Sequence, residues 1–285
     1  MLRLFGFLVL VGSVLGGFLW EEGDLGTLWQ PAEVLIIFGA ALGAFMIANP
    51  VTIQIMTCTH LRYVMASQTE FGRAFYMDLL VLLYKLIDTQ KKHGPLAIEE
   101  HIEEPGNSDI FTLYPRITTH RRLMHFITDN FRVTGMGNIS VAELGSLMER
   151  EINTLADDLK RPAKALQTTA DACPGFGIIA AVMGIVVTME AVDGPIVEIG
   201  MKVAAALVGT FLGILLCYGV IGPLADAVEH TAHDEVLAFS CIKVALTSSL
   251  TGLPSIMAVD AGRRALYSEL RPTFSELEQC LRELD

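Results

Sequence analysis

Charged residues are scarce in this sequence, and the places where they are missing are informative. Of the 285 residues only 18% are charged, 52% are hydrophobic, and the mean hydropathy is +0.48. A soluble domain of this length carries nearer a quarter charged residues. Because the apolar excess is concentrated in runs, the composition excludes an ordinary soluble protein and indicates a membrane protein.

The apolar runs predict four membrane-spanning helices. A spanning helix needs about 20 apolar residues, so the two shorter runs must use flanking residues as well. The first run also resembles a signal peptide, but it is long for one and a second run follows closely, so we expect it to be retained. The four runs are residues 4–19, 34–55, 174–189 and 203–224.

Lysine and arginine are absent from the two short segments between paired runs, residues 20–31 and 190–200. Residues 57–172 hold thirteen of the chain's twenty basic residues, and residues 226–285 hold five. Basic residues stay on the cytoplasmic side of a membrane. Both long segments and both termini are therefore predicted to face the cytoplasm, and the net charge of −12 gives no sign of nucleic-acid binding.

Strand-like alternation and internal repeats are also missing, and the polar segments have helical periodicity. Capping-box patterns at Ser140/Glu143 and at Thr273/Glu276 each predict the start of a helix. The fold class is thus all-α: a polytopic membrane protein with four transmembrane helices and a cytoplasmic helical domain. The expected divisions are residues 1–56 (first two spans), 57–172 (cytoplasmic helices), 173–225 (last two spans) and 226–285 (cytoplasmic helices).

Catalytic signals are absent too. The sequence has no nucleophile paired with a base, no phosphate-binding loop and no metal cluster, so we expect neither an enzyme nor a bound cofactor. The five cysteines lack C-x-x-C spacing, and disulfides are not expected in membrane or reducing space. His230 and His233 have no evident third ligand, so a solvated helix face is the preferred interpretation over a metal site.

No ionisable residue lies in the middle of any predicted span. Glu33 and Glu190 are expected at the outer ends, near the lipid headgroups. A charge at the bilayer centre costs about 2.5–3.5 kcal/mol on insertion scales, and proteins keep one where protons or ions move. Either this chain does not conduct ions, or the carboxylate is supplied by another polypeptide.

Small residues recur every fourth position in the last run, which predicts close helix packing within the chain, in a homo-oligomer or with a partner helix. Thr210 is either bonded to its own helix or a polar contact on an ion path. Pro174 is expected to open the third span and Pro223 to close the fourth; alternatively, Pro223 forms a hinge where membrane meets cytoplasm. The small-residue stripe is Ala205, Gly209, Gly213 and Cys217.

Several motifs together resemble the motility protein A family of flagellar stator subunits, of the gamma-proteobacterial type. Three are in the spans: QPAEVLIIFGAALGAFMIANP (30–50), PGFGIIAAVMGIVV (174–187) and ALVGTFLGILLCYGVIGPLA (206–225). Two are in the polar segments: EEPGNSDIFTLYPRI (103–117) and GRRALYSELRPTFSELE (262–278). The likeness covers essentially the whole chain.

The resemblance implies a ring of these subunits, a pentamer, around two copies of motility protein B. That partner would supply the membrane aspartate and the peptidoglycan anchor. Pro174 and Pro223 match the family's coupling prolines, and Thr210 matches its channel-facing threonine. The transported ion is expected to be a proton, although Thr188 and Thr210 add oxygens that would also suit sodium.

The resemblance also implies contact with the rotor protein FliG through charged residues. In this sequence those positions are Lys91 and Glu99, on either side of Gly94-Pro95. The family's basic residue is often arginine, and lysine lacks its planar fork. The alternative is an energiser of outer-membrane processes like ExbB or TolQ, but such relatives typically have three spans, so the two amino-terminal spans favour the stator.

Overall fold

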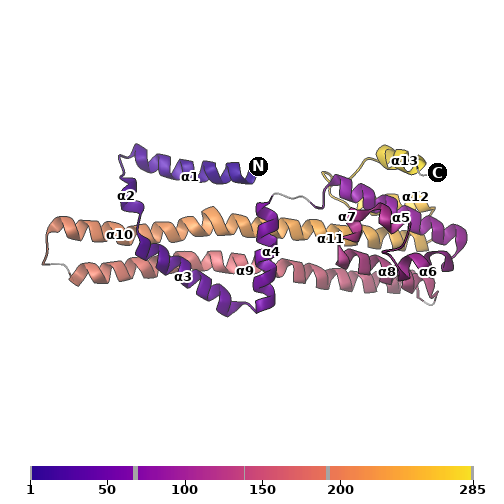
Figure 1. Ribbon diagram of the computed structural model, residues 1–285, viewed down its shortest axis with the longest axis horizontal. Helices are drawn as coiled ribbons and strands as arrows, with labels where there is room; N and C mark the ends of the chain where they lie inside the picture. The colour runs from indigo at the N-terminus through magenta and orange to yellow at the C-terminus, as the bar shows by residue number, and fades with distance from the viewer. Residues whose placement is uncertain (1, 67–69, 138, 191–192, 284–285) are drawn as a thin grey trace. The chain divides into compact units, whose positions relative to one another are not determined.

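The computed structural model describes residues 2–66, 70–137, 139–190 and 193–283, and every regular element in them is helical (Figure 1). The chain divides into two compact units. Unit 1 comprises residues 1–68 and 159–230, and unit 2 comprises residues 69–158 and 231–285.

Unit 1 holds the apolar helices. Three helical stretches are long and apolar enough to cross a membrane: Leu25–Ala48, Val141–Met189 and Ile196–Leu250. Helix α1 is a shorter apolar helix, so the expected count of four spans stays a prediction. The elements of unit 1 are α1 (Leu2–Trp20), α2 (Leu25–Leu28), α3 (Pro31–Ala48), α4 (Val51–Met65), the later part of α9 (Val141–Glu190), α10 (Ile196–Ile214), the π-helical segment η2 (Leu215–Ile221) and the start of α11 (Gly222–Leu250).

The second apolar run does not form one helix, contrary to the expectation of a span over residues 34–55. Helix α3 ends at Ala48, and α4 begins after Pro50. A proline disfavours helical geometry in the residue before it, and Asn49 is accordingly extended, with φ −122° and ψ 135°. The Asn49 amide donates to the Phe45 carbonyl (2.9 Å), which satisfies one carbonyl of the last turn.

Pro174 does not begin a helix, which corrects the interpretation of this proline as a helix start. Helix α9 starts much earlier, at Val141, and continues unbroken past Pro162 and Pro174. Its beginning follows the capping box expected at Ser140 and Glu143, whose side chains each accept a hydrogen bond from the other's backbone N–H.

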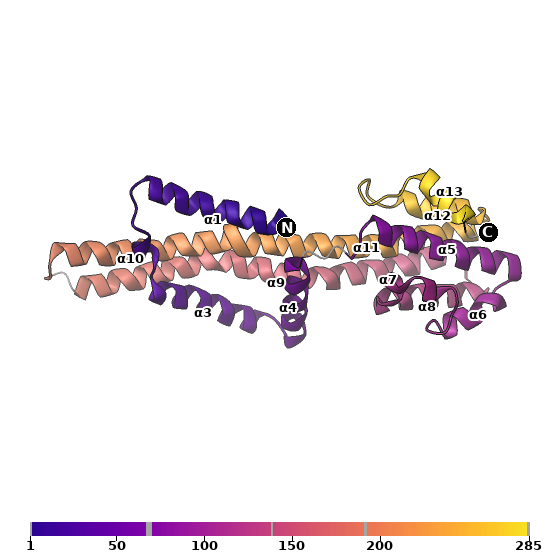
Figure 2. The same ribbon diagram turned by 45° about the horizontal axis from the view of Figure 1, so that its top comes forward.

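Glycines bring α9 and α10 close together in unit 1, where the two helices lie side by side (Figures 1 and 2). A β-carbon on Gly213 would lie 2.7 Å from the Cys173 carbonyl oxygen and 3.0 Å from the Gly177 Cα. Side chains larger than hydrogen cannot fit there without moving backbone. The stripe on the last apolar run therefore packs within the chain at Gly209 and Gly213.

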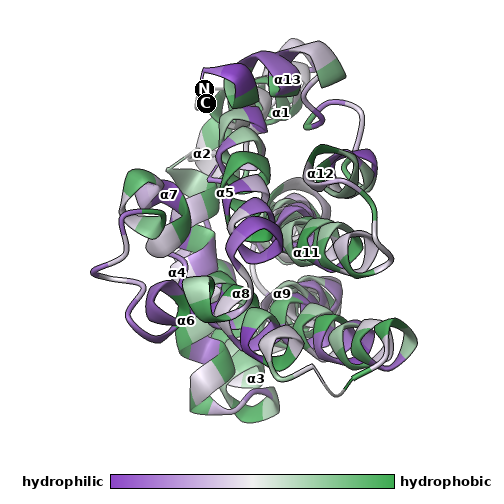
Figure 3. Ribbon diagram, turned by 90° about the vertical axis from the view of Figure 1, so that its right-hand side faces the viewer, coloured by the Kyte–Doolittle hydropathy of each residue, from purple (hydrophilic) through white to green (hydrophobic). Residues whose placement is uncertain are grey.

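Unit 2 is built around α5 (Arg73–His93), a helix with nine buried side chains. Helix α5 contacts α6 (Leu96–Glu103), α7 (Pro115–Thr118), α12 (Ser255–Arg264) and α13 (Phe274–Arg282). The core also includes α8 (Arg121–Gly135) and the parts of α9 and α11 in this unit. Figure 3 shows that α5 and α13 each carry both polar and apolar residues, as expected of amphipathic helices.

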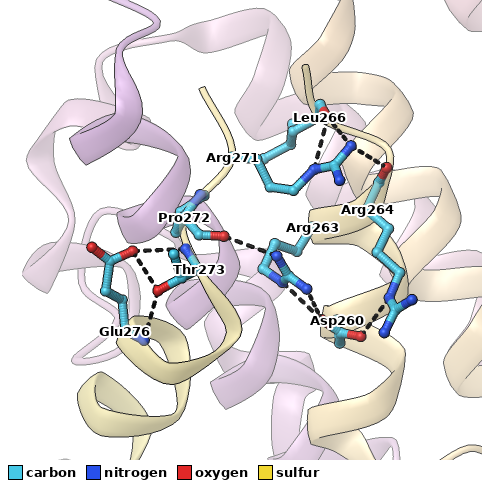
Figure 4. Close-up of polar contacts among 8 residues, drawn as sticks. All are labelled: Asp260, Arg263, Arg264, Leu266, Arg271, Pro272, Thr273 and Glu276. Atoms are coloured by element: carbon cyan, nitrogen blue, oxygen red, sulfur yellow. Dashed lines mark hydrogen bonds and ion pairs between the residues drawn. The ribbon is translucent and has the colours of Figure 1, made fainter. Parts of the chain in front are cut away.

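The last motif of the sequence forms a polar network in unit 2 (Figure 4). Asp260 accepts hydrogen bonds from Arg263 and Arg264, and Arg263 also donates to the Pro272 carbonyl (2.9 Å). The Thr273 hydroxyl and the Glu276 carboxylate then complete the expected capping box of α13. These contacts hold the end of α12 to the segment that leads into α13.

All five cysteines are free thiols. Cys58 is exposed on α4, whereas Cys173, Cys217 and Cys241 are buried and Cys280 is partly buried. Complete burial raises the pKa of the Cys241 thiol to about 12, so this side chain is an unreactive part of the core of unit 2.

Candidate functional site

Thr210 lies on α10 at the interface with α9. Its Cα is 3.3 Å from the position of a β-carbon on Gly177, three residues after Pro174. The Thr210 hydroxyl is half-buried and makes no hydrogen bond with another residue that the structure describes. In contrast, Thr188 donates to the Gly184 carbonyl of its own helix (2.7 Å). Thr210 therefore retains a hydroxyl that can bind a ligand or a partner.

Pro174 belongs to the same α9–α10 interface. It is half-buried and directly follows Cys173, whose carbonyl oxygen faces Gly213. Because proline has no N–H, the Ala170 carbonyl loses its regular helical donor. The turn of α9 that lacks one helical hydrogen bond therefore lies where α10 approaches α9 most closely among these contacts.

Pro223 is exposed at the second residue of α11, directly after the π-helical segment η2. There the Gly222 N–H bonds to the Cys217 carbonyl, five residues back. π-helical turns are rare and occur often at functional sites. The sequence offered a hinge at Pro223 as one interpretation, but it did not predict the seven-residue change of helix type before this proline.

The sequence patterns did not identify Glu33 as a site residue. It lies in the first turn of α3 and is only 6% exposed, because α9 and α10 cover it. The sequence predicted Glu33 near the lipid headgroups but did not predict that other helices of the same chain bury its side chain. The signal available in the sequence was the pair of glycines that leave room for it, Gly184 and Gly209. The side chain of Glu190, the other acid expected at an outer end, lies outside the described residues.

Lys91 and Glu99 are both exposed in unit 2, on either side of the turn at Gly94. Gly94 has φ +85°, a conformation that favours glycine and that separates α5 from α6. The Lys91 ammonium donates to the Leu253 carbonyl. Glu99 has no ion-pair partner among the residues that the structure describes.

Glu99 also borders a groove of about 370 Å³ between α6 and α8. Its walls include Leu96 and Met136, which are 80% and 67% exposed. Arg132 lines the same groove and pairs with Glu103 (2.8 Å). The groove thus combines apolar walls with charged edges.

Comparison with known proteins agrees with this arrangement. Residues 4–94 match the motility protein A N-terminal family, and residues 120–241 match the MotA/TolQ/ExbB proton channel family. Chemotaxis protein LafT of Vibrio parahaemolyticus is 42% identical over 283 residues, 99% of each chain. Motility protein A of Escherichia coli is 42% identical over 282 residues, 99% of this chain and 95% of that one.

A solved structure has the same fold. The flagellar MotAB stator complex from Bacillus subtilis contains a chain that superimposes with a TM-score of 0.71 at 21% identity, covering 97% of this chain and 98% of that one. The match of residues 120–241, which include α10, places this protein in the class of the MotA/TolQ/ExbB proton channel family.

Within that class, the amino-terminal match and the full-length relatives show which family the chain belongs to. The chain belongs to the motility protein A family.

Proposed function

We propose that this chain is a stator subunit of the flagellar motor, which forms a proton channel with motility protein B and converts ion-motive force into torque on the rotor. The observation that carries this proposal is the match of residues 4–94 to the motility protein A N-terminal family. ExbB and TolQ share the channel family, which matches residues 120–241, so the amino-terminal match favours a motor protein over an energiser of outer-membrane processes.

The proposed topology has four spans in the bacterial inner membrane, with both termini in the cytoplasm. Helix α1 is the additional span: it has 19 residues, and large apolar side chains such as Leu4, Phe5 and Leu8 are exposed along it. Most basic residues lie in residues 57–172 and 226–285, which supports a cytoplasmic place for unit 2.

The proposed assembly is a pentamer of this chain around motility protein B, whose membrane aspartate carries the ion. Support comes from glycines with open faces on α1 and α3. Within the part of the chain that the structure describes, a β-carbon on Gly12, Gly16, Gly39 or Gly43 would meet no atom within 4 Å. Glycine stripes in apolar helices favour close contact with another helix, so these faces suit neighbouring subunits.

Pro174, Thr210 and Pro223 are proposed to couple ion movement to a change in helix geometry. The free hydroxyl of Thr210 suits a contact with the ion or with the partner's carboxyl group. The unsatisfied turn at Pro174 and the π-helical segment before Pro223 are places where a helix can change shape at low cost.

Lys91 and Glu99 are proposed to contact charged residues of the rotor protein FliG. Exposed ion pairs contribute only about 0–1 kcal/mol, so each contact can form and release as the rotor steps. The exposure of both side chains supports this role.

Two measurements test the proposal. Expression with motility protein B should restore swimming to a strain that lacks both stator proteins, and expression of either protein alone should not. In vesicles, the complex should conduct protons when active, whereas the purified chain alone should leak little. Robust cation leakage through the chain alone would contradict a channel that needs its partner's carboxylate.

A further inference from the structure

The Glu33 carboxyl group lies against two helices at positions where each has a glycine. Its Oε2 atom is 2.7 Å from the position of a β-carbon on Gly209 of α10. Its Oε1 atom is 3.5 Å from the corresponding position on Gly184 of α9. An alanine at position 209 would therefore displace the carboxyl group, and the glycines are what allow this acid to enter the interface.

The Glu33 carboxyl has no compensating partner. Oε2 is fully buried and makes no hydrogen bond within the described part of the chain. The carboxyl lies against Gly184 of α9 and Gly209 of α10, and the side chains that flank these two glycines there, Ala206 and Ala180, are apolar. The nearest charge in register on α10 is Lys202, seven residues before Gly209, and Lys202 pairs with Glu198 at 3.2 Å.

An ionised carboxylate in such surroundings is expensive, because neither water nor a positive charge offsets its lost hydration. The group therefore needs a cation. A metal ion would need several oxygen ligands, but the walls offer apolar carbon and the nearby Thr188 hydroxyl already donates to the Gly184 carbonyl. A proton needs only the carboxyl oxygen itself.

The position also suits a role in transport. Gly209, against which Glu33 packs, is followed directly by Thr210, whose hydroxyl is uncommitted among the described residues. The unpaired Glu33 carboxyl thus contacts Gly209, and the next residue of the same helix carries the unpaired Thr210 hydroxyl. Buried ionisable groups in membrane helices commonly mark proton or ion pathways.

We propose that Glu33 is a proton-binding site of this chain, and that each subunit thereby adds a protonatable carboxyl to the ion path besides the one on its partner. The proposal rests on the proposed stator function. It revises the expectation that a carboxylate on the ion path comes only from another polypeptide. Proton exchange at Glu33 requires a change in the α3–α9–α10 contact, since the carboxyl is closed off in the arrangement described here.

Dicyclohexylcarbodiimide tests proton binding directly, because it adds to protonated carboxyl groups in apolar surroundings. The complex with motility protein B, in membranes, would be treated at several pH values and the modified peptides identified by mass spectrometry. We expect modification of Glu33 that slows as the pH rises. Position 33 should not be modified in Glu33→Gln, and Glu33 should be modified as in the unaltered chain in Glu198→Gln. Absence of modification at Glu33, while the partner's membrane carboxyl reacts in the same sample, would overturn the proposal. So would protection of Glu33 by sodium ions at constant pH.

A functional arm separates this proposal from the stator assignment. Glu33→Gln should co-purify with motility protein B and lower proton conductance at least about tenfold, and Glu33→Asp should restore part of it. Normal proton conductance in Glu33→Gln would contradict the proposed role of Glu33 and would leave the proposed stator function unaffected. Failure of the unmodified chain to restore swimming would instead count against the stator function. If Glu33→Gln fails to assemble, the modification of the unmodified complex still decides whether Glu33 binds a proton.

Discussion

Arg263 and Asp260 form a buried ion pair on α12, with the arginine Nε 2.7 Å from the aspartate Oδ1. Their side chains are only 10% and 4% exposed. Arg263 also donates to the Pro272 carbonyl, so the pair ties α12 to the segment that leads into α13 (Figure 4). Removal of Asp260 would leave the Arg263 guanidinium buried without a negative charge, whereas removal of Arg263 would leave Asp260 its contact with Arg264.

Asp260→Ala should destabilise unit 2 by about 3–5 kcal/mol, because it leaves the Arg263 guanidinium uncompensated. Hydrogen exchange of the full chain, followed by mass spectrometry, should show amides of α12 and α13 exchanging about a hundredfold faster or more. The control is Glu278→Ala, which breaks an exposed pair with Arg282 and should cost no more than about 1 kcal/mol. Equal exchange in the two variants would contradict a structural role for the buried pair.

The same pair should make unit 2 sensitive to acid. Burial raises the pKa of Asp260, but hydrogen bonds from Arg264 and Arg263 outweigh it and hold this pKa below its usual value. The unfolded value is about 3.9, so the stabilisation is present above about pH 4 and is lost as the pH falls through the folded value. The difference in exchange protection between the unmodified chain and Asp260→Ala should therefore narrow below about pH 4. A constant difference down to strong acid would refute the linkage.

Gly213 and Gly39 should respond differently to larger side chains. Gly213→Ala places a methyl group against the Cys173 carbonyl and the Gly177 Cα, and overpacking of this kind typically costs about 1–3 kcal/mol. The yield of folded chain, measured by size-exclusion chromatography in detergent, should fall. Gly39→Leu should leave the folded chain intact but weaken its assembly, because that face is open within the described chain. Unchanged assembly of Gly39→Leu would argue against a subunit contact at this face.

Lys91→Glu and Glu99→Lys should each reduce swimming speed without lowering the amount of complex in the membrane. Each exposed contact is weak, so a single reversal should impair torque in part, and a matching charge reversal on the rotor should restore some of it. Glu269→Lys is a suitable control because Glu269 is also an exposed acid of unit 2. If no rotor reversal restores speed, direct charge contact is unsupported.

Pro223→Leu should assemble with its partner yet support little swimming. Leucine supplies the N–H that proline lacks, so the helix after η2 can close its regular bonds and lose the proposed flexibility. Co-purification and swimming speed measure the two effects separately. Normal motility would argue against Pro223 as a coupling residue.

The sequence predicted the helical class, the membrane character and both capping boxes, because these depend on local pattern. It predicted neither the break at Asn49 nor the continuity of α9 through Pro174, since a proline can end a helix or be accommodated within it, and tertiary packing decides between these outcomes.

The candidate site was predicted in part. Thr210 lies where α10 contacts α9, and Pro223 lies just after the π-helical segment η2. The burial of Glu33, in contrast, depends on a contact between three helices. Its neighbours Gly184 and Gly209 are about 150 and 175 positions away in sequence. Local periodicity carries no information on such a contact.

The unequal accessibility of the cysteines gives the chain a natural attachment point. Of the five thiols, Cys58 alone is exposed, while the others are buried or partly buried. A maleimide fluorophore applied to the native complex would therefore mark each copy of this chain mainly at one position. Stepwise photobleaching of single complexes could then count subunits without an added tag.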